Sequence, residues 1–375
     1  MMMASRTARA GLRVLFFGSD DFALPTLKAL HRSSKAHVAA LDCVCPARSN
    51  FRRRSGPLPV ARYAEEHGLP VHPVGPEHRG TLAAWDPPAS AAAFDLAVVV
   101  SFGYFLPRAL LERFPLGAVN LHPSLLPRWR GASPVQHTLL HGDARAGVSV
   151  IDVHPTRMDA GDVLAQAELE GFDGGAGAGA RVTHAALRAS LAELGASAVA
   201  DVAGRGRDAF VAAREASVPQ AALLQAANGD ADAGDADAQP RAPKVTKAMG
   251  EVVFAGEGAA AVARRWRALG DGAAGGGGCW ATLDGRRVKL IELAGVVDDD
   301  GGESESAAAG TWQMDRRCRI HDGGDGEAVD KAVTVVCADG ARVAVTRLQM
   351  EGKKPATGEA FNNGFKAALG DQLFA

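Results

Sequence analysis

The first half of the chain alternates short apolar runs with segments of helical spacing. Residues 12–17 (LRVLFF), 95–100 (DLAVVV) and 117–121 (GAVNL) are almost entirely apolar, as in strands that are buried on both faces. Helical spacing is found at residues 22–31, 61–67, 81–85 and 105–114. The alternation predicts an α/β fold with a Rossmann-like, mostly parallel open sheet.

The composition changes after residue 225. Residues 134–141 and 183–202 still have helical spacing, and 148–153 reads as a strand. From 226 to 246 Asp, Ala and Gly dominate, which predicts a flexible linker. Later short runs with turn signals and one helix predict a small β-barrel. We therefore expect an N-terminal segment at 1–11, an α/β domain at 12–225, the linker at 226–246 and a barrel domain at 247–375.

Asn120 and His122 lie two residues apart at the end of a predicted strand. While the strand pleat persists, both side chains leave on the same face. Ligands of open α/β sheets bind beyond the carboxyl ends of the strands. An amide that polarises a carbonyl group and an imidazole that moves a proton near neutral pH suit acyl-group transfer. The same pair also occurs in ordinary hydrogen-bonded turns, so the residues that follow decide between the two interpretations.

Residues 123–127 (PSLLP) enclose Ser124, Leu125 and Leu126 between two prolines. Because proline restricts the backbone, we expect a rigid loop that exposes both leucines and three backbone N–H groups. An apolar surface beside a polar pair predicts a pocket for a flat ring.

The run 120–136 (NLHPSLLPRWRGASPVQ) resembles the signature of the methionyl-tRNA formyltransferase family. Its first part is similar to formyltransferases more widely, including those that act on nucleotide sugars, and RWRGASPVQ is more particular to the tRNA enzymes. The resemblance extends with gaps from Arg13 to Leu373. It departs at Asp20, which replaces the proline of the family's F-G-T-P-x-F loop, and after Trp266, where an N-P-W-P element is missing.

The resemblance implies transfer of a formyl group from 10-formyltetrahydrofolate to the amino group of initiator methionyl-tRNA, for translation initiation. It implies a formyltransferase fold followed by an OB-like barrel that holds tRNA, and it implies no metal. The catalytic residues would be Asn120, His122 and Asp159, the last from the family's D-x-G-D pattern. Residues expected to hold the folate are Phe102, Gly103, Ser124, Leu125, Leu126 and Pro127.

Basic residues gather near the N-terminus, although the formal net charge is only −2. Residues 1–60 contain ten Lys or Arg and three Asp or Glu. An arginine-rich stretch at 46–58 is compatible with a solvated loop, but guanidinium groups also bind phosphates, and the family has a basic insertion here that reaches the tRNA. We expect tRNA contacts from Arg48, Arg52, Arg53, Arg54, Lys244, Lys247, Lys353 and Lys354.

Other classes of function find little support in the residues. The first strand is not followed by G-x-G-x-x-G, so a nicotinamide or flavin site has no fingerprint. Five scattered cysteines imply neither a disulfide framework nor a zinc site. No run reaches the ~18 apolar residues of a membrane helix, so we expect no membrane partner.

Residues 1–11 contain two arginines and no acidic residue. They fit an organellar transit peptide, which would place the protein in a mitochondrion or plastid, or a frayed terminus of a bacterial-type cytoplasmic protein. We expect a monomer. Two alternative functions remain open: a formyltransferase that acts on a small amine such as a nucleotide sugar, and a non-catalytic tRNA- or folate-binding relative.

Overall fold

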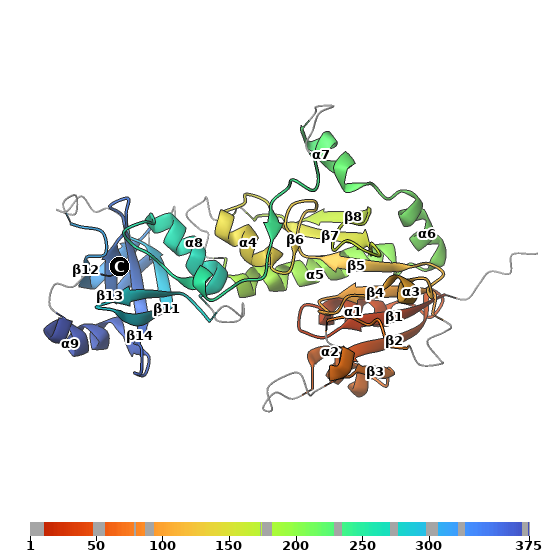
Figure 1. The fold of residues 1–375 in the computed structure, drawn as a ribbon, viewed down its shortest axis with the longest axis horizontal. Coiled ribbons are helices and arrows are strands. Elements are labelled where there is room, and N and C mark those ends of the chain that lie inside the picture. The colour runs from red at the N-terminus through yellow and green to blue at the C-terminus, as the bar shows by residue number, and fades with distance from the viewer. Residues whose placement is uncertain are drawn as a thin grey trace, which may run out of the picture. The chain divides into compact units, whose positions relative to one another are not determined.

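A computed structural model of the 375-residue chain describes residues 11–47, 57–78, 80–86, 94–172, 174, 182–228, 235–270, 277–297, 307–321, 327–369 and 374 (Figure 1). The chain forms two compact units. Unit 1 comprises Met1–Gly131, Gly147–Leu169 and Arg188–Arg241, and unit 2 comprises Ala132–Ala146, Glu170–Leu187 and Ala242–Ala375.

Unit 1 is built on a seven-stranded sheet with the order β3-β2-β1-β4-β5-β7-β8. The strands from β3 to β5 are parallel, whereas β7 runs antiparallel to both β5 and β8. The mostly parallel sheet predicted from the apolar runs is therefore confirmed. The strands are β1 (Leu12–Gly18), β2 (Val38–Pro46), β3 (Val71–Val74), β4 (Leu96–Val100), β5 (Ala118–His122), β7 (Gly147–Asp152) and β8 (Val163–Glu168).

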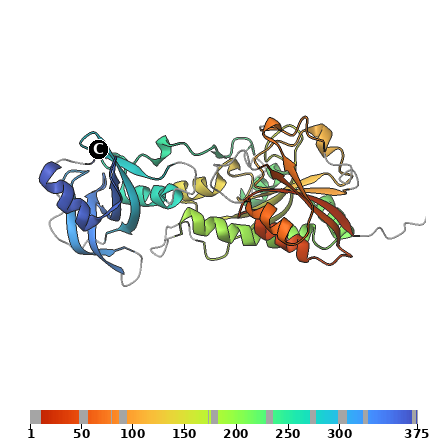
Figure 2. The ribbon, with the colours of Figure 1, turned by 90° about the horizontal axis from the view of Figure 1, so that it is seen from below.

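Helices and loop segments cover this sheet on both faces (Figure 2). Leu15 and Phe17 of β1 point toward Phe102 and Phe114, and the Phe17 and Phe102 rings are 5.3 Å apart. The opposite face includes Leu121, which lies against Gly195 of α5. Burial on both faces explains why these strands are almost continuously apolar. The helices of this part are α1 (Leu24–Arg32), α2 (Pro59–Glu66), η2 (Pro76–His78), α3 (Arg108–Leu111), α5 (His184–Val202), α6 (Arg207–Glu215) and α7 (Gln220–Asn228).

Two of the predicted helical pieces are wrong. Residues 81–85 begin with a β-bridge between Thr81 and Phe105 and continue as turns. The helix expected at 105–114 is only the four-residue α3, because Pro107 precedes it in an extended conformation and Pro115 follows its last turn. By contrast, α5 begins after Thr183, whose hydroxyl accepts a hydrogen bond from the Ala186 N–H (3.3 Å), as predicted for a Thr cap.

Asp20 organises the loop between β1 and α1. Its carboxylate accepts hydrogen bonds from the Ser101 hydroxyl (2.7 Å) and from the N–H groups of Phe22 and Ala23 (3.1 and 3.2 Å), and it pairs with Arg188 (2.6 Å). Asp20 thus joins the carboxyl ends of β1 and β4, although the proline of the family pattern is absent. The loop is held by side-chain hydrogen bonds in place of proline's restricted backbone.

Unit 2 contains an antiparallel sheet with the path β10-β11-β14-β13-β12, and β15 pairs with β14. A bridge between Val297 and Ile320 and a hydrogen bond from the His321 N–H to the Val296 carbonyl (2.7 Å) connect β12 back to the end of β11. The C-terminal β-domain expected from the short runs is therefore present as an antiparallel sheet, and its closure into a barrel stays a prediction. The strands are β10 (Trp280–Leu283), β11 (Arg286–Val296), β12 (Trp312–Ile320), β13 (Glu327–Val336), β14 (Arg342–Met350) and β15 (Ala356–Thr357).

The helices of unit 2 include α4, which comes from the middle of the sequence. It contacts α8, and the His137 ring forms a hydrogen bond with the Pro243 carbonyl (3.1 Å). These helices are α4 (Pro134–His141), η4 (Ala248–Gly250), α8 (Ala259–Leu269) and α9 (Gly358–Leu369), and the short strands β6 (Arg130–Gly131) and β9 (Arg241–Ala242) pair with each other. Among the described residues, no helix combines the length and apolarity needed to span a membrane.

Close packing of α5 on β5 gives a prediction for stability. A Cβ atom added at Gly195 would lie 2.5 Å from Cδ2 of Leu121, a side chain that is buried and cannot move aside. We expect Gly195→Val to lower the free energy of unfolding by about 2 kcal/mol through overpacking. Ser197→Val, on the exposed side of the same helix, should change it by less than about 0.5 kcal/mol. Denaturant unfolding of both variants tests this, and equal stability would contradict the packing described here.

Candidate active site

His122 ends β5 with its ring almost fully buried, at 4 % exposure. Its Nε2 lies 2.9 Å from the Trp129 carbonyl oxygen, and its Nδ1 lies 3.7 Å from Oδ1 of Asp159. A carbonyl oxygen only accepts hydrogen bonds, so Nε2 must carry the proton in this contact. Both ring nitrogens therefore face hydrogen-bond acceptors.

Asn120 lies two residues earlier on β5 and is partly exposed. Over the part of the chain that the structure describes, its side-chain amide has no hydrogen-bond partner. The amide can therefore offer both N–H donors to a bound carbonyl group without first breaking a contact.

Asp159 lies in the turn between β7 and β8 and has a left-handed backbone conformation, with φ at +53°. Its Oδ2 accepts a hydrogen bond from the Gly131 N–H (2.9 Å), and Oδ1 faces His122. The structure thus brings His122 and Asp159 together, as expected from the sequence. Asp162, the other acid of the turn, is exposed. Its backbone carbonyl accepts a hydrogen bond from the Asp152 N–H (2.9 Å).

Half-buried Asp152 lies at the end of β7 beside this turn. Burial raises the pKa of its carboxyl group, and the Arg214 guanidinium, 3.2 Å away, opposes that shift. Its backbone carbonyl would be 1.8 Å from a Cβ atom on Gly161. The turn can therefore approach β7 this closely only with glycine at position 161.

Ser149 of β7 is fully buried and holds the loop 123–127 through hydrogen bonds. The Ser149 hydroxyl donates to the Ser124 carbonyl (2.8 Å) and accepts from the Leu126 N–H (3.1 Å) and the Gln166 amide (2.9 Å). Gln166 also donates to the Leu126 carbonyl (3.0 Å). The predicted rigid loop is therefore present, and side chains of β7 and β8 hold it in addition to the prolines.

The prediction that this loop exposes two leucines and three N–H groups is wrong. Leu126 is only 2 % exposed and packs with Ile151 and Val163, while Leu125 is partly buried. The N–H groups of Ser124 and Leu126 are already bound, to the His122 carbonyl (2.9 Å) and to Ser149. Leu126 turns into the core because an apolar side chain is more stable there than in water.

Phe102 and Gly103 follow β4, the strand next to β5. Phe102 is buried in the core of the sheet, and its ring lies 5.1 Å from that of Tyr104. Gly103 has φ at +79°, with open space where a side chain would be. Of the two, only the backbone around Gly103 is accessible to a ligand.

The residues expected to bind tRNA lie in different parts of the chain. Arg48, Arg52, Arg53 and Arg54 fall outside the described residues. Lys244 and Lys247 are exposed before η4, and Lys353 and Lys354 are exposed in the turn after β14. All four lysines belong to unit 2.

Several residues that support the site were missed in the sequence. Ser149 was detectable in principle, since it is the one hydroxyl in an otherwise apolar strand, GVSVI. Gln166 and Gln220 carry no local signal, because a glutamine in a strand or at a helix start is common. Arg130 lies within the recognised run, but nothing in the sequence indicates that its side chain is buried.

The cysteines and acidic residues of the described chain form no metal site. All five cysteines are reduced and buried, and burial raises the pKa of Cys45 to about 12. Within the described ranges, no cluster of three or more His, Cys, Asp or Glu side chains is arranged to hold a metal ion.

Comparison with known proteins shows which family this chain resembles. Residues 12–176 match the Formyl transferase family, and residues 244–366 match the Formyl transferase C-terminal domain. The methionyl-tRNA formyltransferase of Paracoccus denitrificans is 32 % identical over 366 residues, which cover 96 % of this chain and 100 % of the relative. The mitochondrial methionyl-tRNA formyltransferase of Bos taurus is 41 % identical over 158 residues, 41 % of this chain and 36 % of that protein.

A solved structure also shares the fold. The sugar 3N-formyltransferase WlaRD superimposes with a TM-score of 0.52 over 92 % of this chain and 100 % of that protein, at 10 % identity. The sequence similarity, which extends over nearly the whole length, decides the family: this chain belongs to the methionyl-tRNA formyltransferases.

Proposed function

We propose that the protein transfers the formyl group of 10-formyltetrahydrofolate to the amino group of methionine esterified to initiator tRNA. The observation that carries this proposal is the position of His122, whose ring lies between the Trp129 carbonyl and the Asp159 carboxylate. The unpaired amide of Asn120 lies beside it on the same strand. Full-length relatives from two bacteria are named for the same reaction.

The reaction requires stabilisation of a negative charge on the formyl oxygen. The neutral methionine amine attacks the formyl carbon, a C–N bond forms, and the carbonyl electrons move onto oxygen. The Asn120 amide donates a hydrogen bond to this oxygen, and the positive charge of His122 stabilises it from the buried side of the site. When the oxyanion collapses, the bond between the formyl carbon and the folate nitrogen breaks.

A proton must also pass from the attacking amine to the leaving folate nitrogen. The 3.7 Å between Nδ1 of His122 and Oδ1 of Asp159 is too long for a direct hydrogen bond. A proton on Nδ1 therefore remains available to a reacting group. His122 supplies the proton to the folate nitrogen, and the amine proton restores it.

The folate is held along the loop 123–127 and the backbone near Gly103. Leu125, which is partly buried, offers an apolar surface to the pterin, and Ser124, Leu126 and Pro127 fix the shape of the loop. Phe102 supports the Gly103 turn from the core.

Binding of tRNA is assigned to basic residues in both units. The arginines at 48 and 52–54 provide phosphate contacts for the catalytic domain at 12–225, and the four exposed lysines provide them for the C-terminal domain at 247–375. The linker at 226–246 connects the two domains. The protein acts as a monomer where translation starts with formylmethionine, which is a bacterial-type cytoplasm, a mitochondrion or a plastid.

One assay tests the function and the catalytic residues together. With 10-formyltetrahydrofolate, the protein should formylate methionyl initiator tRNA but neither uncharged tRNA nor a nucleotide amino-sugar. Asn120→Ala and His122→Ala should each lower the single-turnover rate by about 10²–10³-fold, because each removes stabilisation of the oxyanion. The control His67→Ala, at the exposed residue that follows the last turn of α2, should match wild type. Formylation of the sugar in place of the tRNA, or normal rates in both site variants, would contradict this assignment.

The loop 123–127 gives a second prediction. Ser149→Ala removes the shared partner of Ser124, Leu126 and Gln166 and leaves buried polar groups unpaired, which typically costs about 1–3 kcal/mol. We expect about tenfold weaker folate binding by fluorescence titration, with tRNA binding unchanged. Ser197→Ala, on the exposed face of α5, is the matched control. Unaltered folate affinity in Ser149→Ala would exclude this loop as the folate site.

The arginine stretch gives a third prediction. Arg52→Ala combined with Arg53→Ala should weaken tRNA binding and reduce the slope of log K against log[salt] by about 1–2, since each phosphate contact releases a counterion. Folate affinity should not change. Arg108→Ala with Arg113→Ala removes two exposed arginines elsewhere in unit 1 and should leave the slope unaltered. The same slope in both double variants would mean that this stretch does not contact tRNA.

A further inference from the structure

The turn that carries Asp159 begins far from His122 along the strand direction. In the β5–β7 pairing His122 is opposite Ser149, and Val119 is opposite Asp152, so the chain leaves β7 beside the start of β5. The loop 153–162 must fold back over the sheet to bring Asp159 within 3.7 Å of His122. Strand pairing does not impose this return, and other contacts must hold it.

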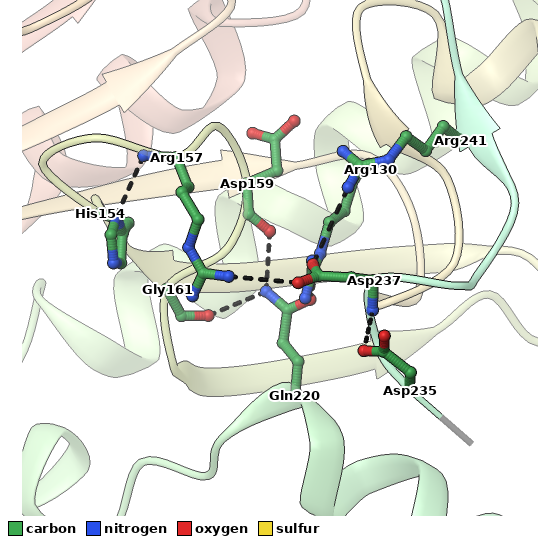
Figure 3. Close-up of polar contacts among 9 residues, drawn as sticks. All are labelled: Arg130, His154, Arg157, Asp159, Gly161, Gln220, Asp235, Asp237 and Arg241. Carbon is green, nitrogen blue, oxygen red and sulfur yellow. Dashed lines mark hydrogen bonds and ion pairs between the residues drawn. The ribbon is translucent and has the colours of Figure 1, made fainter.

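Gln220, at the first turn of α7, makes two of these contacts. Its side-chain NH2 donates to the Asp159 carbonyl (2.8 Å) and to the Gly161 carbonyl (2.9 Å), and Gln220 is 4 % exposed. Figure 3 shows Gln220 reaching from α7 into the turn, with the Asp159 carboxylate on the other side. One amide thus binds two backbone carbonyls of this turn. Asp159 in the turn has a left-handed backbone conformation, which surrounding contacts must maintain.

Arg130 determines which way the Gln220 amide faces. Its Nε donates to Oε1 of Gln220 (2.8 Å). Because a guanidinium only donates, the amide oxygen must face Arg130 and the NH2 must face the two carbonyls. The Arg130 side chain is buried, and its charge is compensated by Asp237, which also binds Arg157 (3.3 Å).

The short segment 129–131 therefore contacts His122, Gln220 and Asp159. The Trp129 carbonyl meets the His122 ring, the Arg130 side chain orients Gln220, and the Gly131 N–H binds the Asp159 carboxylate. The Asp159 carboxylate is thus held directly by this segment, and its backbone is held by Gln220, which the same segment orients.

We propose that Gln220, oriented by Arg130 and Asp237, is a positioning residue that sets the distance between Asp159 and His122 during formyl transfer. The inference rests on the proposed function, because it acts through the role assigned to Asp159. Gln220 does not contact the substrates, and its loss affects the chemical step more than substrate binding.

The main variant is Gln220→Glu. A carboxylate of nearly the same size keeps the contact with Arg130 but places an acceptor against the two carbonyls, so both hydrogen bonds to the turn are lost. We expect kcat to fall by about 10–100-fold, as misplaced catalytic groups typically cause, while KM for both substrates stays near wild type. The pH profile of kcat should also shift, because the surroundings of His122 change. Gln220→Met removes the donors without adding charge and should give the same loss of kcat.

A double-variant cycle separates positioning from a general structural role. Asp159→Asn removes the carboxylate charge, and asparagine tolerates the left-handed conformation. If Gln220 acts through Asp159, adding Gln220→Glu to Asp159→Asn should not lower the single-turnover rate further. Multiplied losses in the double variant, or wild-type kcat and pH profiles in both Gln220 variants, would overturn the inference.

Controls identify which proposal has failed. Gln313→Glu makes the same change at an exposed position of β12 and should leave kcat unchanged. Thermal unfolding and tRNA binding show whether each Gln220 variant is folded. The kcat values are compared only between folded variants. If Gln220→Glu unfolds, Gln220→Met takes its place. Active His122→Ala and Asp159→Asn variants would overturn the catalytic assignment itself. Inactive His122→Ala and Asp159→Asn variants beside fully active Gln220 variants would overturn only this inference.

Discussion

The site depends on how the loop between β7 and β8 returns to the end of β5. Pairing of β5 with β7 places the exit of β7 near Val119, whereas Asp159 lies beside His122. The return is maintained by hydrogen bonds to backbone groups of the loop and to the Asp159 carboxylate, from Gln220 and from Gly131. A carboxylate held in this way keeps its orientation relative to the imidazole, and such preorganisation is what electrostatic catalysis requires.

Polar side chains of two strands serve the same end beneath the loop 123–127: Ser149 is fully buried, and Gln166 is exposed. Ser149 and Gln166 lie on strands, where position is well defined, and they bind the loop's backbone groups. A buried polar group is costly unless it is paired, and the buried Ser149 hydroxyl pairs with loop groups that would otherwise be unsatisfied. The loop is thereby fixed to the rigid sheet.

The protein retains the architecture of its family while using different residues in one loop. Asp20 stands where the family pattern has proline. Its carboxylate binds the Ser101 hydroxyl, the N–H groups of Phe22 and Ala23 just before α1, and the Arg188 guanidinium. A hydrogen-bonded carboxylate and a proline limit the same backbone by different means. This explains how a chain that is 32 % identical to its bacterial relatives can keep the carboxyl ends of β1 and β4 together.

The sequence by itself determined most of the strands, a mostly parallel sheet and Asn120 and His122 as candidates, and resemblance to a family added Asp159, because apolar runs and short motifs are local properties. It also indicated the antiparallel C-terminal sheet. It did not reveal that Leu126 is buried, that α3 is only one turn long, or that Arg130 and Gln220 support Asp159. These features depend on contacts between residues far apart in the chain, such as the 90 positions that separate Arg130 from Gln220. A local pattern shows which chemistry a side chain can perform, but only the folded chain decides which buried donors meet which acceptors.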